Sequence, residues 1–314
     1  MFSPESAHRV TIVGTGTIGA SWATHYLARG FDVTATDPAP GAEAALRSYV
    51  EGAWDGVTKL GLAPGASPDR LKFTSDLAAA LTDADFVQEN GPERPELKVK
   101  LFADIDAATP VDSIIASSSS GITMSEIQVQ CRHPERTVIG HPFNPPHVIP
   151  LVEVVGGKQT SPETISATMD FYRFVGKKPI LLKKELPGHV ANRIQSALYR
   201  EVAYLIGAGV LDVADADDAV SWGPGLRWGV MGPSLLWHLG GGQGGIQHFM
   251  DTLMPRMAAN WPGLGNPEFT PELAQQIVTG VLEEADGKSI DELATQRDAV
   301  LFDLITSRVK HGTR

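Results

Sequence analysis

The sequence lacks most features of secreted and membrane proteins. Cys131 is the only cysteine among 314 residues, so no disulfide can form within the chain, and we expect a reducing, cytoplasmic compartment. No apolar run approaches the about 18 residues of a membrane-spanning helix. The first ten residues also lack the basic and apolar regions of a signal peptide.

Positive charge is scarce as well. Lys and Arg number 26 against 37 Asp and Glu, which gives a net charge of −11 and argues against nucleic acid or an anionic membrane as a partner. The chain has no internal repeat, and its one glycine-rich cluster covers residues 239–245. This length and an ordinary globular composition are compatible with two domains.

The first half alternates apolar, β-branched segments with helical ones. Strand candidates lie at 9–13, 31–37, 71–76, 84–90 and 113–119, and helical periodicity covers 18–30, 40–54, 77–83 and 95–108. Such alternation predicts an α/β Rossmann-type, doubly wound parallel sheet covered on both faces. Strand candidates at 137–144, 150–157 and 178–183 lack long intervening helices, so we expect differently directed strands at this edge.

The second half is predicted to be all helical. Long apolar periodicity covers 190–210, 212–222, 233–239, 246–261, 271–285 and 290–308. We therefore place a boundary near Pro187, with an NAD-binding domain over 1–186 and a helical substrate and dimerisation domain over 187–314.

The motif GTGTIG supplies Gly14, Gly16 and Gly19 between the first strand and the first helix, and Asp37 follows the second strand. This is the dinucleotide fingerprint, in which the glycines allow a tight turn at the pyrophosphate and the acid binds the ribose hydroxyls. A carboxylate repels a 2′-phosphate, so we expect NAD as the cofactor. Thr17 and Ile18 are expected to contact the cofactor too. The alternative is a strand–helix turn that merely uses glycine.

Two further groups suggest redox chemistry on a substrate oxygen. The cluster SSSSG at 117–121 ends a strand, where ligands of this fold class bind. His141 and Glu153 flank a proline-rich bend, which can bring them side by side. A histidine can move the proton of the substrate oxygen while a carboxylate orients it. The alternative is a buried structural histidine and a glutamate with a local partner.

Taken together, these segments resemble the 3-hydroxyacyl-CoA dehydrogenase superfamily. The motifs GTGTIG, QENGPE, SSSSG, GHPFNPPHVIPLVEVVGG and LPGHVANRI, together with Asp37, follow the order and spacing of the family over residues 8–200.

The resemblance implies a role for particular residues. It implies His141 as general acid/base, Glu153 as its orienting partner, and Ser120 and Asn192 at the substrate oxygen or carbonyl. It also implies that Glu93 and a lysine, Lys98 or Lys100, line the cofactor cleft. The asparagine usual in the family's serine stretch is replaced by Ser118, which puts that nicotinamide contact in doubt.

Arg227 in WGPGLRWGVMGP favours one branch of this family. The stretch resembles the branch of L-gulonate 3-dehydrogenase (the lambda-crystallin relatives), L-carnitine dehydrogenase and a pyridine-carboxylate alcohol dehydrogenase, whose substrates are free carboxylates. A guanidinium binds a carboxylate through two parallel hydrogen bonds. Alternatively, Arg227 packs on Trp228. Trp222, Trp228 and Trp237 could enclose a quaternary ammonium, or belong to the core.

The sequence thus predicts an NAD-dependent dehydrogenase of a small 3-hydroxy carboxylic acid, gulonate- or carnitine-like. The other possibilities are a short-chain 3-hydroxyacyl-CoA dehydrogenase and a non-catalytic, crystallin-like NAD-binding protein. No metal site is expected. Many large apolar residues in the C-terminal half predict a homodimer: Leu235, Leu236, Trp237, Phe249, Met250, Leu253, Met254, Met257 and Trp261.

Overall fold

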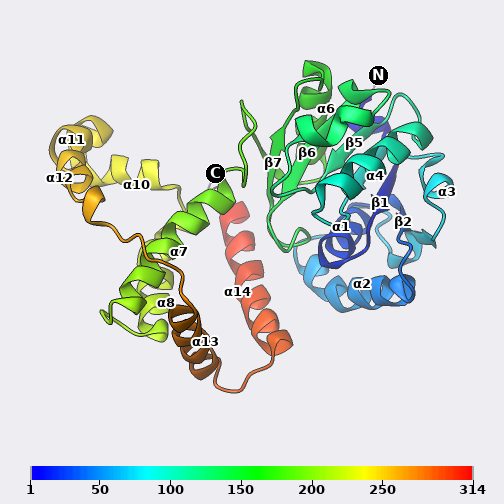
Figure 1. The fold of residues 1–314 in the computed structure, drawn as a ribbon. Helices are drawn as coiled ribbons and strands as arrows, with labels where there is room; N and C mark the ends of the chain where they lie inside the picture. Colours follow the sequence, from blue (N-terminus) through cyan, green and yellow to red (C-terminus); the bar gives the residue numbers. More distant parts are fainter. Residues whose placement is uncertain (1, 313–314) are drawn as a thin grey trace. The chain divides into compact units, whose positions relative to one another are not determined.

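The apolar strands of the first half form one eight-stranded sheet in the computed structural model, which describes residues 2–312 (Figure 1). The strand order is β3-β2-β1-β4-β5-β6-β7-β8. The bounds are β1 (Arg9–Val13), β2 (Asp32–Thr36), β3 (Leu71–Thr74), β4 (Phe86–Glu89), β5 (Ile114–Ser117), β6 (Thr137–Pro142), β7 (Leu151–Val155) and β8 (Lys178–Leu181). Strands β1 to β5 are parallel, as predicted, and β6 continues parallel to β5 although its segment was grouped with the differently directed strands.

Successive residues of the central strands β4, β5 and β6 enter two different hydrophobic cores. In β5, Ile114 and Ala116 belong to one core, and Ile115 between them belongs to the other. A strand buried on both faces needs an unbroken apolar run, which is why these segments do not alternate with polar residues.

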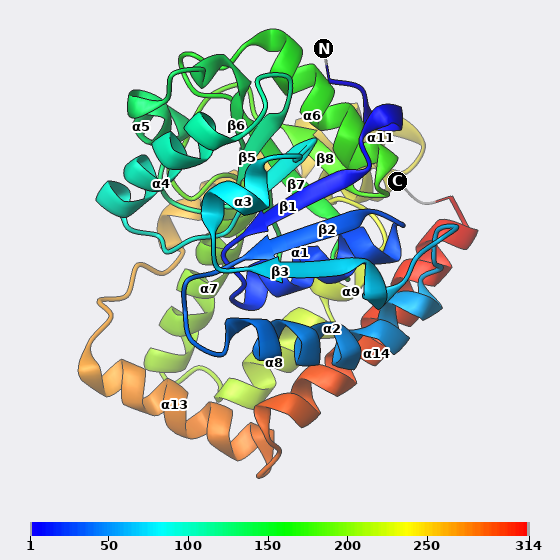
Figure 2. The same ribbon diagram turned by 90° about the vertical axis from the view of Figure 1, so that its right-hand side faces the viewer.

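Helices cover both faces of this sheet (Figure 2). One core receives side chains from α1 (Thr17–Ala28), α2 (Ala42–Lys59) and α6 (Pro162–Phe174). The other receives them from α3 (Leu77–Leu81), α4 (Pro95–Ala108) and α5 (Met124–Ile127). Short 3₁₀ turns complete this part: η1 (Pro4–Ser6), η2 (Pro68–Arg70), η3 (Gln128–Gln130) and η4 (Pro134–Arg136).

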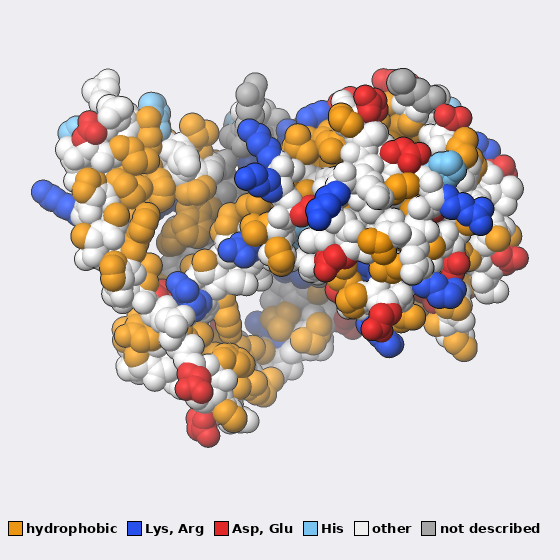
Figure 3. Space-filling model, turned by 45° about the horizontal axis from the view of Figure 1, so that its top comes forward, with side chains coloured by type: hydrophobic (Ala, Val, Ile, Leu, Met, Phe, Trp, Pro, Cys, Tyr) orange, Lys and Arg blue, Asp and Glu red, His pale blue; other side chains and the backbone are white. Residues whose placement is uncertain are grey.

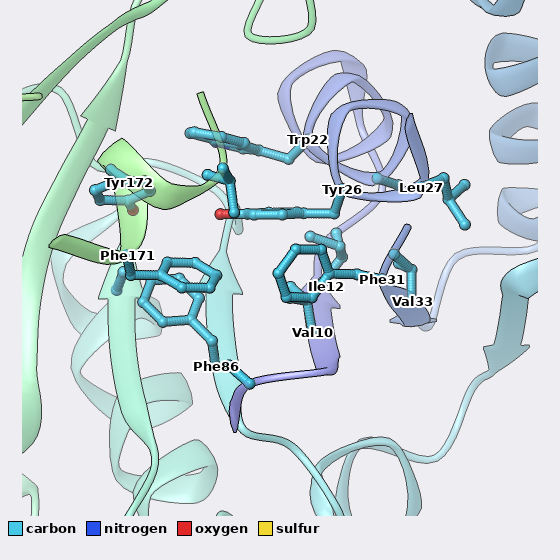
Figure 4. Close-up of a cluster of buried hydrophobic side chains, with 14 of the residues drawn as sticks. Val10, Ile12, Trp22, Tyr26, Leu27, Phe31, Val33, Phe86, Phe171 and Tyr172 are labelled. Carbon is cyan, nitrogen blue, oxygen red and sulfur yellow. The ribbon is translucent and has the colours of Figure 1, made fainter. Parts of the chain in front are cut away.

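Aromatic rings fill the core beneath α1 and α6 (Figure 4). Trp22 and Tyr26 lie one turn apart on α1, so their rings stack with centroids 5.3 Å apart. Phe86 of β4 and Phe171 of α6 stack with centroids 4.1 Å apart. These contacts fix α1, and with it the glycine turn, against the centre of the sheet.

The edge of the sheet changes direction once, between β6 and β7, where no helix intervenes. β7 is antiparallel to β6, as expected, whereas β8 is parallel to β7. The expectation that no long helix intervenes was wrong, because α6 connects β7 to β8. Its start signals were present: Ser161 accepts a hydrogen bond from the amide of Thr164, and Pro162 occupies the first turn.

The chain divides into two compact units, Met1–Asn192 and Arg193–Arg314, a few residues beyond the predicted boundary. The second unit is helical, as predicted, and α7 (Ala191–Gly207) begins just before it. Its other helices are α8 (Val213–Ser221), α9 (Pro224–Trp228), α10 (Pro233–Gly240), α11 (Gly245–Thr252), α12 (Met254–Ala259), α13 (Pro271–Ala285) and α14 (Ile290–Lys310), with η5 (Gly242–Gly244) and η6 (Trp261–Gly263).

Side chains of α7, α8 and α13 form the core of the second unit, which includes Ile206, Val213 and Ile277. The segment predicted as one helix over 246–261 is divided into α11 and α12, because Pro255 in the first turn of α12 cannot continue the preceding hydrogen-bond ladder. The glycine-rich cluster forms the connection between α10 and α11. Within residues 2–312, no helix is both long and apolar enough to cross a membrane.

Candidate active site

The glycine motif forms the turn between β1 and α1. Gly14 has a φ of +85°, and a Cβ there would lie 2.9 Å from the backbone carbonyl of Asn90. A Cβ on Gly19 would lie 1.9 Å from the carbonyl oxygen of Gly14, so glycine is required for α1 to approach the strand so closely. A Cβ on Gly16 would meet no atom within 4 Å. Open space therefore lies beside the N-terminus of α1, where N–H groups and the helix dipole suit a pyrophosphate.

Asp37 follows β2 and lies beside the glycine turn. Its carboxylate accepts hydrogen bonds from the amide of Thr15 at 2.8 Å and from the amide of Ala39 at 2.9 Å. Oδ2 also accepts from the Thr15 hydroxyl at 3.2 Å, whereas Oδ1 accepts only from Ala39 and retains capacity for a ribose hydroxyl. Thr17 and Ile18 are the first two residues of α1, exposed and half-buried respectively. The residues present thus fit a dinucleotide.

His141 and Glu153 stand directly opposite each other in the antiparallel β6–β7 pair. Nδ1 of His141 lies 2.9 Å from Oε2 of Glu153, and the two residues are 6% and 1% exposed. An ionised carboxylate can only accept a hydrogen bond, so Nδ1 carries the proton and Nε2 of the neutral ring is left as a base. This pairing matches the predicted short bend between the two strands.

Glu153 is held in its ionised form by the start of α7. Its Oε1 accepts hydrogen bonds from the amides of Val190 at 2.8 Å and Ala191 at 3.0 Å. Burial alone would raise the pKa of this carboxyl, but the hydrogen bonds from His141, Ala191 and Val190 together lower it. Asn192 lies in the same first turn of α7 and is half-buried.

The bend over residues 143–150 is anchored from two sides. The Ser21 hydroxyl lies 2.7 Å from Nδ1 of His147 and accepts a hydrogen bond from its amide. The buried Lys177 ammonium donates to the carbonyls of Pro146 and Ile149. Burial and the charge of Arg29 place the pKa of Lys177 well below its usual value.

Glu93 shapes the serine loop after β5. Its Oε1 accepts hydrogen bonds from the amides of Ser120 at 3.0 Å and Gly121 at 2.7 Å, and from the hydroxyl of Ser119 at 2.6 Å. Partial burial raises the pKa of Glu93, but these bonds and the charge of Lys98 produce a net lowering. The half-buried Ser120 is therefore positioned through its own backbone.

Lys98 and Lys100 occupy different environments. Lys98 is 1% exposed, and its ammonium lies 2.9 Å from Glu89 and 3.7 Å from Glu93. Lys100 is exposed and pairs with Asp104. Lys98 thus lies below the serine loop and connects to it through Glu93.

Ser118 has no hydrogen-bonding capacity left for a nicotinamide. Its hydroxyl donates to Oδ1 of Asn90 at 2.7 Å and accepts from Gln88 at 2.9 Å and from Trp22 at 3.3 Å. A hydroxyl has one donor and two acceptor positions, and all three are engaged. The doubt about this position is therefore supported by the geometry.

Arg227 and the three tryptophans belong to the second unit. Arg227 is an exposed residue of α9. Trp222 and Trp228 are 75% and 40% exposed, and Trp237 stacks on Phe249 with ring centroids 5.6 Å apart. Two of the three tryptophans are thus not core residues of this unit.

Two residues of the site escaped the sequence prediction. Glu89 is fully buried at the end of β4, where it binds Lys98, the hydroxyl of Ser117 and the amide of Gly91. His189 lies against His141, with ring centroids 4.9 Å apart. The polar run Gln88–Asn90, which begins at the end of β4, was a usable signal for Glu89, whereas no local pattern indicated His189. Among residues 2–312, no group of three or more metal-binding side chains gathers at one place.

The sequence model of the 3-hydroxyacyl-CoA dehydrogenase NAD-binding domain matches residues 9–186, and that of the C-terminal domain of the same family matches residues 188–266. The chain belongs to the 3-hydroxyacyl-CoA dehydrogenase family. Its cofactor is NAD, and it is an oxidoreductase that dehydrogenates the hydroxyl of a 3-hydroxy acid. The predicted family, cofactor and enzyme class are confirmed.

Relatives extend over nearly the whole dehydrogenase. An L-carnitine dehydrogenase of Streptomyces coelicolor is 47% identical and covers 99% of this chain and 98% of its own. One of Pseudomonas putida is 46% identical, with 96% and 95% covered. The crystal structure of an NAD-dependent 5-formyl-3-hydroxy-2-methylpyridine 4-carboxylic acid 5-dehydrogenase superposes with a TM-score of 0.83 at 31% identity, covering 98% and 100% of the two chains.

Glu153→Gln provides a test of the charge at the centre of the dyad. The folded pKa of Glu153 is lowered, so its charge stabilises the fold above the unfolded pKa of about 4.3 and this contribution disappears as pH falls. We expect a loss of about 1–3 kcal/mol in unfolding free energy at neutral pH, shrinking below about pH 4. Thermal unfolding against pH measures it. Exposed Glu51→Gln is the control, and an equal loss at acid and neutral pH would contradict the assignment.

Proposed function

We propose that this dehydrogenase oxidises the 3-hydroxyl of L-carnitine with NAD. The dyad of His141 and Glu153 at 2.9 Å is the observation that carries the reaction type. The relatives named L-carnitine dehydrogenase, similar over nearly the full chain, support the substrate.

The dyad has the arrangement that alcohol oxidation requires. Nε2 of His141 accepts the proton of the 3-hydroxyl while the C–H electron pair leaves C3 as a hydride and the ketone forms. Bound NAD supplies the hydride acceptor. Glu153 keeps Nδ1 protonated and stabilises the imidazolium that results, because its carboxylate stays ionised.

The remaining first-unit residues bind and orient the two reactants. In this proposal Ser120 and Asn192 donate hydrogen bonds to the substrate oxygens. Glu93 and Lys98 support the loop that carries Ser120. Asp37 would hold the cofactor's ribose, and the start of α1 would hold its pyrophosphate beside Gly14, Gly16, Thr17, Ile18 and Gly19.

L-Carnitine carries a carboxylate and a quaternary ammonium, and the second unit contains side chains suited to each. Arg227 is proposed to bind the carboxylate in a bidentate pair. The exposed Trp222 and Trp228 are proposed to contribute faces to the ammonium site. A CoA thioester lacks both groups at its acyl end, so these residues favour the free acid.

The substrate assay follows NADH formation with L-carnitine, L-gulonate and 3-hydroxybutyryl-CoA. We expect turnover of L-carnitine with the highest kcat/KM of the three.

His141→Ala should lose about 10²–10⁴-fold in kcat while NADH binding stays intact, because the histidine acts on the substrate oxygen. Preference for the thioester would overturn the substrate, and activity of His141→Ala within about threefold of wild type would overturn the role of the dyad.

Arg227→Met tests the carboxylate contact. Losing a charge-assisted hydrogen bond of about 1.5–3 kcal/mol should reduce kcat/KM for L-carnitine about 10- to 150-fold. The methyl ester of carnitine, which has no carboxylate, should be affected little. Lysine should restore part of the loss, since a point charge cannot replace the planar fork. Equal losses on acid and ester would show that Arg227 has a structural role.

We also propose that the enzyme is a cytoplasmic homodimer. Apolar side chains gather on the surface of the helical unit, as Figure 3 shows. Of the residues predicted for this interface, Phe249 is buried and Leu236, Trp237 and Met254 are half-buried. The exposed ones are Leu235, Met250, Leu253, Met257 and Trp261. A second copy covering these side chains would remove them from water.

Light scattering of the purified enzyme at micromolar concentration should report twice the mass of one chain. Leu235→Glu combined with Met257→Glu should shift it to the monomer, because two charges would be buried against apolar surface. Val111→Glu, at an exposed apolar position of the first unit, is the matched control and should remain dimeric. A monomeric wild type would refute the dimer.

A further inference from the structure

His189 occupies a strained position in the turn that precedes α7. Its φ is +47°, a left-handed conformation that costs a non-glycine residue free energy. Its own amide donates to the carbonyl of Leu186 at 2.9 Å. The next two amides, of Val190 and Ala191, are those that bind Glu153. The turn thus directs the first amides of α7 toward Glu153, and it places the His189 side chain beside His141.

The tautomer of His189 follows from its hydrogen bond. Nε2 lies 2.9 Å from the carbonyl oxygen of Ser119, which can only accept, so Nε2 carries the proton. Nδ1 of the neutral ring is then a bare acceptor. The residue is 3% exposed, and within residues 2–312 this nitrogen has no hydrogen-bond partner. Buried polar atoms without a hydrogen-bond partner are rare in folded proteins, so the position of this nitrogen calls for an explanation.

The ring of His189 lies against that of His141, tilted by 40° with centroids 4.9 Å apart. Burial lowers the pKa of His189, and the nearby His141 acts in the same direction. The bond to Ser119 and the charges of Glu153 and Glu93 only partly oppose this. His189 therefore stays neutral at neutral pH. The ring of His189 thus places no positive charge beside His141.

His189 connects two hydrogen-bond networks that are formed by different segments of the chain. One contains His141, Glu153 and the first amides of α7. The other contains Glu93 and the serine loop, including the amide of Ser120. The backbone of His189 directly precedes the amides of the first network, and its side chain binds the second through Ser119.

We propose that His189 is a positioning residue that fixes Ser120 relative to His141, so that both reach the same substrate oxygen. The hydrogen bond to Ser119 sets the position of the serine loop, and the ring of His189 packs against His141, whose orientation is set by Glu153. The inference rests on the proposed roles of His141 and Ser120, and not on L-carnitine being the substrate.

Two substitutions of His189 separate the effect of its hydrogen bond to Ser119 from the effect of its ring contact with His141. His189→Gln keeps an N–H donor near the position of Nε2 and loses the ring. His189→Phe keeps a ring of similar size and loses the donor. Neither residue favours a positive φ, so backbone strain is matched between the two variants. Folded fraction is measured by thermal unfolding, and kcat is expressed per NADH-binding site.

His189→Phe should lower kcat about 10- to 100-fold with KM for NAD unchanged, because a displacement of about 1 Å at the reacting groups has that effect. His189→Gln should retain kcat within about fivefold of wild type, a rescue that a role confined to stability would not produce. A kcat of His189→Phe within twofold of wild type, or equal losses in both variants, would overturn the proposal.

A second measurement does not depend on the substrate. Nitrogen NMR of the enzyme labelled at histidine, with the His189 signal assigned by its loss in His189→Gln, reports the tautomer directly. We expect a neutral ring protonated at Nε2 at neutral pH. A ring protonated at Nδ1 or at both nitrogens would overturn the proposal. If wild type fails to oxidise L-carnitine but shows this tautomer, the substrate is wrong and the positioning role stands.

Discussion

The hydrogen bond between His141 and Glu153 depends on strand register, and much of the site is arranged around it. The two residues meet because β6 and β7 pair antiparallel with these positions opposite each other. A slip by one residue would turn one side chain to the other face of the sheet. The anchored bend over 143–150 prevents such a slip, because Ser21 and Lys177 hold it from α1 and from the start of the last strand segment.

Three carboxylates held by donors of the protein build the rest of the site: Glu153 and Glu89 are buried, and Glu93 is partly exposed. Glu153 is held by a helix start, Glu93 by four donors of the serine loop, and Glu89 by Lys98. A buried ion pair contributes little net stability, since desolvating both groups offsets their attraction. The pair between Glu89 and Lys98 is better explained by geometry, because it fixes the ends of β4 and β5 beneath Ser120.

The fold and the dyad could be predicted because their signals are local. Strand–helix alternation, the glycine turn and a short bend between two strands are visible within a few residues each. The helix α6 was not predicted, although Ser161 and Pro162 mark its start. The contacts of Glu89 with Ser117 and of His189 with Ser119 join residues far apart in sequence. A single sequence carries no trace of such pairs, so only the folded chain reveals them.

The two adjacent histidines of the site have opposite tautomers, and each tautomer is set by a hydrogen-bond partner. Glu153 gives His141 a fixed tautomer with its proton on Nδ1, so the other nitrogen is the base. The carbonyl of Ser119 gives His189 the opposite tautomer, with its proton on Nε2. Two adjacent imidazoles with different partners therefore take different roles: Nε2 of His141 serves as the base, and burial lowers the pKa of His189 so that its ring stays neutral. The assignment of roles follows from the partner of each ring and not from the residue type.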